Sequence, residues 1–259
     1  MLKSVERPKK AEIDQAAGLR RMFGARHQLV AFASGDNRCG RTALLVQTAK
    51  KLAEAGERVV LIDENTGPES ALASLKVETP GDLWDSLIGS IALERLIIPV
   101  RPNLWAIAAN GVATRLHHDT PVIRSKIEML MNPLLAGASF VLINSRLAVG
   151  SPLSVLSSTA QHMVVVVGAE TTAITESYGL IKQLALERGR EGFHVVITGP
   201  QADVLGGKIV ANLKKTAMDH LGVRIDLLAT IRKPVADNVA EELFSRLPLL
   251  AQGLGDQLG

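Results

Sequence analysis

Aromatic residues and cysteine are scarce in this sequence of 259 residues, and each absence narrows the class of protein. Phe, Trp and Tyr make up 3% of the chain, so the core must be built from Leu, Val, Ile and Ala. Aliphatic runs of this kind are typical of parallel strands that are buried on both faces. The only cysteine, Cys39, excludes an intramolecular disulfide and fits a reducing compartment.

Long hydrophobic segments are also missing. The chain is 47% hydrophobic, yet no stretch approaches the roughly 18 apolar residues that a membrane-spanning helix needs. The first ten residues are charged and lack the apolar core of a signal peptide. We therefore expect a soluble, cytoplasmic protein with about one large domain, because the length suffices for a single α/β core.

Positive charge is concentrated near the N-terminus. Residues 1–26 contain seven basic and three acidic residues, a net of +4, whereas the whole chain carries +3, so the remainder carries about −1. A nucleic-acid-binding domain would need a basic face of its own, and we therefore expect no nucleic-acid partner. We expect a basic arm (1–26), a domain (27–246) and a C-terminal tail (247–259).

Aliphatic runs of strand length alternate with segments of helical periodicity. The runs lie at 29–33, 58–62, 104–108, 140–143, 163–167, 194–197 and 225–229. Apolar residues at helical spacing predict helices between them, for example over 44–52, 123–131 and 174–184. This alternation predicts an α/β fold with a doubly wound, mostly parallel sheet flanked by helices.

The first run ends in a sequence that partly matches a phosphate-binding loop. Residues 34–42 read Ser-Gly-Asp-Asn-Arg-Cys-Gly-Arg-Thr and precede a helical segment. This is the context in which G-x-x-x-x-G-K-[ST] binds phosphates. Gly35, Gly40 and Thr42 match the pattern, whereas Arg41 stands in place of lysine. An ordinary strand-to-helix turn is the alternative interpretation of the same residues.

Two further segments resemble a known family. Residues 14–20 read Asp-Gln-Ala-Ala-Gly-Leu-Arg, and residues 163–167 form a valine-rich run followed, at 171–182, by Thr-Thr-Ala-Ile-Thr-Glu-Ser-Tyr-Gly-Leu-Ile-Lys. The first segment resembles the D-Q-A-x-x-L-R element of FlhG (FleN) proteins, and the second resembles their P-T-A-I-T-D-x-Y-x-L-I-K helix. The chain thus resembles the FlhG branch of the MinD/ParA-type P-loop ATPases from Asp14 to about Leu250. This resemblance implies a MinD-like P-loop fold.

Compared with this family, the nucleotide site is degenerate. Asp36 stands at the signature lysine, and the next two residues replace glycines. The family's Asp-x-Asp after the second strand reads Asp63-Glu64-Asn65, and its Walker B aspartate is Asn144. Because Mg²⁺ prefers anionic oxygen ligands, the amide of Asn144 weakens the metal shell. Glu64 is the nearby carboxylate that could substitute.

The resemblance implies nucleotide contacts that the substitutions have eroded. We expect ATP and Mg²⁺ to bind poorly, hydrolysis to be slight or absent, and no metal-binding residue set. The family's adenine-contacting asparagine is replaced by Thr198. The degenerate catalytic positions are Asn65 and Asn144. The degenerate nucleotide-binding positions are Gly35, Gly40, Arg41, Thr42 and Asp63.

The resemblance also assigns an activity to the arm. In FlhG proteins the D-Q-A-x-x-L-R element stimulates FlhF, a GTPase related to those of the signal recognition particle. Here it implies that Asp14, Gln15, Leu19 and Arg20 activate a partner GTPase. A glutamine that orients water and an arginine that meets phosphate charge are tools of GTPase activators. The alternative is that this short helix docks on the chain's own core.

We therefore expect a regulator of flagellar number and placement that acts on an FlhF-type GTPase and is a pseudo-ATPase. Flagellar basal-body or C-ring components are further expected partners. Two alternatives stay open. The first alternative is a working MinD/ParA-type ATPase with an atypical P-loop, and the second is a MinD-like positioning factor for another polar machine.

The C-terminal segment has an apolar helical face without a basic polar face. Relatives use such a helix to reach membranes, but anionic lipid favours a basic face. We therefore expect the first half of this segment to pack on the core and its end to fray. Peripheral association with the inner membrane or the cell pole is the alternative that stays open. The apolar residues are Val239, Leu243, Phe244, Leu247, Leu250, Leu254 and Leu258.

Overall fold

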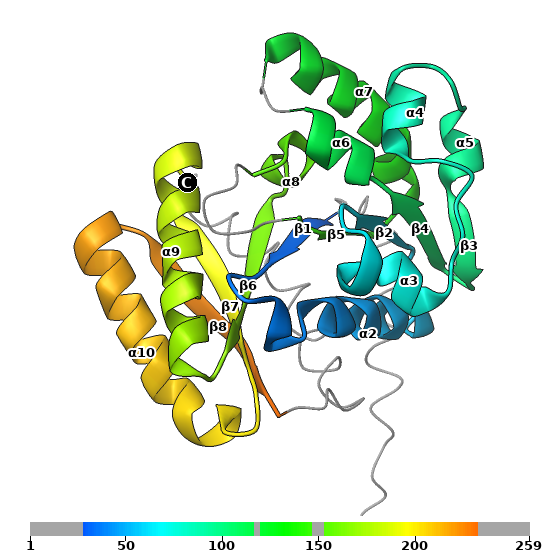
Figure 1. The fold of residues 1–259 in the computed structure, drawn as a ribbon. Helices are drawn as coiled ribbons and strands as arrows, with labels where there is room; N and C mark the ends of the chain where they lie inside the picture. Colours follow the sequence, from blue (N-terminus) through cyan, green and yellow to red (C-terminus); the bar gives the residue numbers. More distant parts are fainter. Residues whose placement is uncertain (1–27, 117–119, 147–152, 233–259) are drawn as a thin grey trace, which may run out of the picture.

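The computed structural model describes residues 28–116, 120–146 and 153–232. Within them the strands form an eight-stranded sheet in the order β3-β4-β2-β5-β1-β6-β7-β8 (Figure 1). Neighbouring strands are parallel, except that β3 runs antiparallel to β4. The mostly parallel, helix-flanked sheet predicted from the sequence is thereby confirmed.

The strands agree closely with the aliphatic runs. Their bounds are β1 Gln28–Ala33, β2 Val59–Asp63, β3 Ile98–Arg101, β4 Leu104–Ala108, β5 Phe140–Asn144, β6 His162–Gly168, β7 Gly192–Thr198 and β8 Arg224–Ile231. All seven predicted strands are present. The sequence did not predict β3, a short edge strand that contains Pro99 and pairs with β4 through a register shift. Proline is tolerated there because an edge strand leaves one side unpaired.

Helices cover both faces of the sheet (Figure 1). The α-helices are α2 Arg41–Glu54, α3 Ala71–Leu75, α4 Leu83–Leu87, α5 Leu93–Leu96, α6 Asn110–Arg115, α7 Pro121–Gly137, α8 Val155–Ser158, α9 Thr171–Arg188 and α10 Ala202–Leu221. Two 3-10 turns, η1 Asn37–Cys39 and η2 Gly67–Glu69, follow β1 and β2. The long helices α2, α7 and α9 contain the three apolar stripes expected from the sequence.

Each face of the sheet has its own aliphatic core. On one face α2 and α3 bury residues such as Leu44 and Leu52 against Phe32 and other strand side chains. On the opposite face α7, α9 and α10 pack against Val165 and its neighbours. Both clusters consist almost entirely of Leu, Ile, Val and Ala, as the shortage of aromatic residues requires.

Several expectations fall on residues outside the described ranges. They are the activating helix with Asp14, Gln15, Leu19 and Arg20, and the C-terminal segment from 233 onward. The domain bounds at 26 and 247 therefore stay predictions. Within the described part of the chain, no helix is both long enough and apolar enough to cross a bilayer.

Candidate functional site

The predicted site residues lie at the carboxyl ends of β1, β2 and β5, which are neighbours in the sheet. Ligands of open α/β sheets bind at this edge. The register places Asp63, the last residue of β2, directly beside Asn144, the last residue of β5. It also places Asn144 beside Phe32, one residue before β1 ends. The topology therefore brings the loop after β1, the carboxylate of Asp63 and the amide of Asn144 together.

In the loop after β1, an acidic side chain accepts a hydrogen bond from a backbone N–H group of the same loop. The Asp36 carboxylate accepts hydrogen bonds from the Arg38 backbone N at 2.9 Å and from Arg38 Nε at 3.3 Å. Gly40 then adopts a left-handed conformation (φ 80°), and α2 begins at Arg41. A phosphate-binding loop aims its N–H groups at the ligand. In this loop, an acidic side chain already takes the Arg38 N–H.

Gly35 lies against α9. A Cβ atom at this position would come within 2.5 Å of the backbone carbon of Glu176. The close approach of two backbones is therefore sufficient reason for a glycine here, independent of any phosphate.

The end of the loop that precedes α2 is hydrogen-bonded to β7. The Thr198 hydroxyl donates to the Cys39 carbonyl oxygen at 2.7 Å, and both residues are buried. Thr198 occupies the position expected to contact adenine, and its hydroxyl is used inside the protein. Burial raises the pKa of the Cys39 thiol, which favours the neutral form and gives this residue no evident chemical role.

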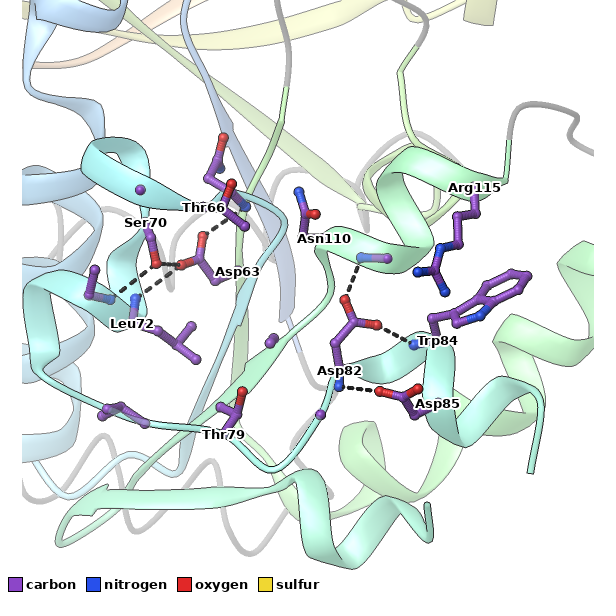
Figure 2. Close-up of a pocket in the computed structure, with 17 residues that line it drawn as sticks. Asp63, Thr66, Ser70, Leu72, Thr79, Asp82, Trp84, Asp85, Asn110 and Arg115 are labelled. Atoms are coloured by element: carbon purple, nitrogen blue, oxygen red, sulfur yellow. Dashed lines mark hydrogen bonds between the residues drawn. The ribbon is translucent and has the colours of Figure 1, made fainter. Parts of the chain in front are cut away.

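The segment after β2, which we call the latch segment (residues 64–70), is held to the Asp63 carboxylate (Figure 2). Asp63 Oδ1 accepts from the Asn65 N–H at 3.1 Å and from Asn144 Nδ2 at 2.8 Å. Oδ2 accepts from Ser70 Oγ at 2.7 Å and from the Leu72 N–H at 3.0 Å. Both carboxylate oxygens are thus engaged by protein donors, and Asp63 is fully buried.

The carbonyl oxygen of Glu69 joins the latch segment to the loop and to β5. It accepts hydrogen bonds from Thr42 Oγ1 at 3.0 Å and from Asn144 Nδ2 at 2.9 Å. Asn144 Nδ2 therefore donates to two acceptors, which fixes the orientation of its amide. Thr42, expected to bind nucleotide, and Asn144, expected at the metal, both donate to this main-chain oxygen.

Arg41 lies beneath the same segment. Its Nη2 lies 3.6 Å from Glu69 Oε2, and its side chain is only 2% exposed. Desolvation lowers the pKa of its guanidinium, while nearby groups, Glu69 and Asp63 among them, oppose that shift. No residue in the described ranges accepts a hydrogen bond from Arg41 Nε or Nη1. These two N–H groups are the feature of the site that still suits an anion.

Glu64, the first residue of the latch segment, is hydrogen-bonded to residues that follow β5. Its buried carboxylate accepts from Ser154 Oγ and, at 2.9 Å, from the Arg146 N–H. Burial raises the pKa of this carboxyl group, while the hydrogen bonds of the serines and of Arg146 oppose the shift. Glu64 is therefore committed to the connection after β5 and is not placed to replace a metal ligand. The Asn65 side chain likewise donates to the Asn144 carbonyl oxygen at 2.8 Å.

The donor set does not fit Mg²⁺. A magnesium ion needs oxygen acceptors, whereas Asn144 presents its N–H₂ group here and Asp63 has no free oxygen. No group of three or more His, Cys, Asp or Glu side chains within the described ranges could hold a metal ion.

The sequence located this site but missed the residues that close it. The expected residues that form or adjoin the network are Gly40, Arg41, Thr42, Asp63, Asn65 and Asn144. Glu69 and Ser70 were not predicted, although the network depends on both. The Glu69 contribution comes from its backbone carbonyl, for which a sequence contains no signal. Ser70 could have been found as the N-cap of α3, since its side chain accepts from the Ala73 N–H.

No protein-family model matches the chain. In sequence it is similar to the antiactivator FleN of Pseudomonas aeruginosa, with 23% identity over 213 residues that cover 82% of this chain and 76% of FleN. In structure it is similar to the MinD cell division protein of Aquifex aeolicus, with a TM-score of 0.64 and 18% identity over 85% of this chain and 96% of MinD. An ATP complex of McdA from Cyanothece gives a TM-score of 0.64 with 14% identity, covering 91% and 100% of the two chains.

These comparisons confirm the resemblance that the two sequence segments indicated. The structural neighbours establish the fold, and the similarity to FleN indicates the branch. The chain therefore has the fold of the MinD and McdA structures, and in sequence it is similar to FleN.

Proposed function

We propose that this chain is an FlhG-like regulator of flagellar number and placement, in which hydrogen bonds within the protein hold the latch segment instead of nucleotide and Mg²⁺. The observation that supports this most directly is the Glu69 carbonyl oxygen, which accepts from both Thr42 and Asn144. Thr42 stands where the family binds nucleotide and Asn144 where it holds the metal, and both donate within the protein instead. On this proposal the chain is a pseudo-ATPase that acts by binding another protein.

The energy of the network supports the same proposal. Two hydrogen bonds to the Asp63 carboxylate, from Asn65 and Ser70, and two to the Glu69 carbonyl oxygen hold the latch segment. Hydrogen bonds contribute ~1 kcal/mol each and more when one partner is charged, so the set stabilises the segment by on the order of 5 kcal/mol or more. A magnesium nucleotide would have to break several of these bonds to enter, which greatly weakens its binding.

A binding titration tests the pseudo-ATPase proposal. We expect calorimetry to detect no binding of MgATP to the full chain at micromolar protein, and no phosphate release above background. The matched control is Thr42→Ala, which removes one donor to Glu69 and should leave the background unchanged. Magnesium-dependent turnover that disappears in Thr42→Ala would refute the proposal and favour the working ATPase.

As the partner that this chain regulates, we propose an FlhF-type GTPase, which the family resemblance implies. FleN is named an antiactivator, which supports a role in controlling another protein. A peptide covering residues 12–23 should stimulate the GTPase without the rest of the chain. Gln15→Ala should abolish stimulation but keep binding, whereas Leu19→Asp should remove binding. Arg20→Ala should lower stimulation by ~10³-fold, because an arginine that meets phosphate charge has an effect of that size.

The arm experiment also separates the remaining alternatives. An inert peptide, together with a full-length Leu19→Asp variant that melts several degrees lower, would place the helix on the chain's own core. If the peptide is inert and the melting temperature is unchanged, the positioning factor for another polar machine becomes the better proposal.

A further inference from the structure

A cavity of about 510 Å³ lies next to the latch segment. One wall comes from the end of β2, the latch segment and α3, and the other from α4 and α6 (Figure 2). None of Gly35, Gly40, Arg41 and Thr42 lines it, so it is separate from the phosphate loop. A cavity of this size at the carboxyl edge of an α/β sheet is large enough for a small ligand or a side chain.

The cavity is acidic. Three carboxylates and one guanidinium line it: Asp63, Asp82, Asp85 and Arg115. Asp82 caps α4 and is held in place by the N–H groups of Trp84, at 2.6 Å, and of Gly111. Asp85 Oδ2 accepts from the Asp82 N–H at 2.8 Å, while its Oδ1 takes part in no hydrogen bond between described residues. Backbone donors therefore fix Asp82 and Asp85, and Asp85 keeps an acceptor that no described residue uses.

The two amides that line the cavity also offer acceptors. Asn110 Nδ2 donates to the Glu64 carbonyl oxygen at 3.0 Å, and Asn65 Nδ2 donates to the Asn144 carbonyl oxygen at 2.8 Å. Each amide thus uses its N–H₂ group within the protein, and no described residue donates to its Oδ1. The free polar atoms of these side chains suit a ligand that is rich in donors and positively charged.

An aromatic ring completes the lining. The Arg115 guanidinium carbon lies 5.3 Å from the centroid of the Trp84 ring, in cation–π contact. Arg115 is exposed, whereas Trp84 is half-buried. Such a contact is weak at an exposed site, so Arg115 can be displaced. The indole therefore already binds a guanidinium at the rim of the cavity.

We propose that this cavity binds a guanidinium group on an alkyl stem. A guanidinium presents five N–H donors in a plane and stacks on aromatic rings, whereas an ammonium is a compact point charge. Its stem would lie along Leu72 and Val77, and its donors would meet Asp85 and the two asparagine oxygens. The group comes either from a small free cation or from an arginine of a partner protein. This inference stands independently of the arm and of the pseudo-ATPase proposal.

The test uses N-butylguanidinium and its neutral isostere N-butylurea with the full chain, followed by calorimetry and by the NMR signal of the Trp84 indole, assigned with Trp84→Phe. We expect N-butylguanidinium to bind and the urea not to bind. Asp85→Asn should weaken binding roughly tenfold or more, because a hydrogen bond to a charged group is lost. It keeps an acceptor for the Asp82 N–H and should fold normally. The matched control, Asp219→Asn on α10, should not change binding.

Arg115→Ala should strengthen binding of N-butylguanidinium, whereas Asp85→Asn should weaken it. Removing the guanidinium that already lies on Trp84 lowers the positive charge at the rim and frees the ring, so binding should tighten severalfold. A Gly-Gly-Arg-Gly-Gly peptide with blocked termini then distinguishes an arginine of a partner protein from a small free cation. Binding at least tenfold tighter than N-butylguanidinium identifies a protein side chain, and equal or weaker binding identifies a free cation. Absent binding of both probes, equal binding of the urea, or unchanged affinity in Asp85→Asn would overturn the proposal.

Discussion

Replacing Asn144 by aspartate, the residue expected in a working ATPase, should strongly destabilise this protein. Asn144 Nδ2 lies 2.8 Å from Asp63 Oδ1 and 2.9 Å from the Glu69 carbonyl oxygen. An aspartate would present an oxygen to two acceptors in a buried site. It would lose both hydrogen bonds and place a second carboxylate beside Asp63.

The magnitude follows from these distances. Two hydrogen bonds, one of them to a charged group, contribute ~2–4 kcal/mol. Two unit charges about 3 Å apart repel by ~5 kcal/mol at an effective dielectric constant of 20, before the site relaxes or takes up a proton. Because relaxation and proton uptake remove part of both effects, we expect Asn144→Asp to lower the free energy of unfolding by about 3–5 kcal/mol. For a chain of this size that lowers Tm by roughly 6–20 °C.

Thermal melting at pH 7.5 in EDTA measures the effect, with Asn144→Ala as the control. Alanine removes the hydrogen bonds without adding charge, so the gap between the two variants reports the repulsion. Burial beside Asp63 should raise the pKa of the new carboxyl group, so its cost is present above that pKa and shrinks as the pH falls. Asn144→Asp melting within about 2 °C of the unmodified chain would refute the hydrogen-bond network.

Two further predictions concern packing and pH. Gly35→Ala should lower the free energy of unfolding by a few kcal/mol, with or without nucleotide, because the new Cβ meets the α9 backbone. The control is Gly207→Ala, whose Cβ meets nothing within 4 Å and which should stabilise the protein slightly. Equal melting temperatures of the two variants would contradict this prediction. Burial and, to a smaller extent, His194 and Arg190 lower the pKa of His162 from 6.5 to about 4. Its stabilising contribution is therefore complete above pH 6.5 and declines by up to roughly 3 kcal/mol as the pH falls to 4. Denaturant unfolding of His162→Gln should show a flatter decline over this range, and parallel curves would exclude His162 as the cause.

The sequence by itself determined seven of the eight strands in the described residues, the sheet class and the resemblance to FlhG proteins. The aliphatic runs were long and separated by clear helical stripes, so local pattern and burial agreed at every predicted strand. The loop after β1 was located by its position between a strand and a helix. The departures from the family pattern, at Asp36 and Arg41 in this loop and at Asn144 at the end of β5, were visible residue by residue.

Tertiary structure decided what those departures do. Asn144 looked like a weakened metal ligand, but its register beside Asp63 makes it a donor to the Asp63 carboxylate and to the Glu69 carbonyl oxygen. Gly35 looked like a phosphate contact, but α9 lies too close for any side chain. The Glu69 carbonyl and the cavity beside Trp84 had no sequence signal, because a backbone oxygen is present in every residue and a cavity forms only where distant segments pack together.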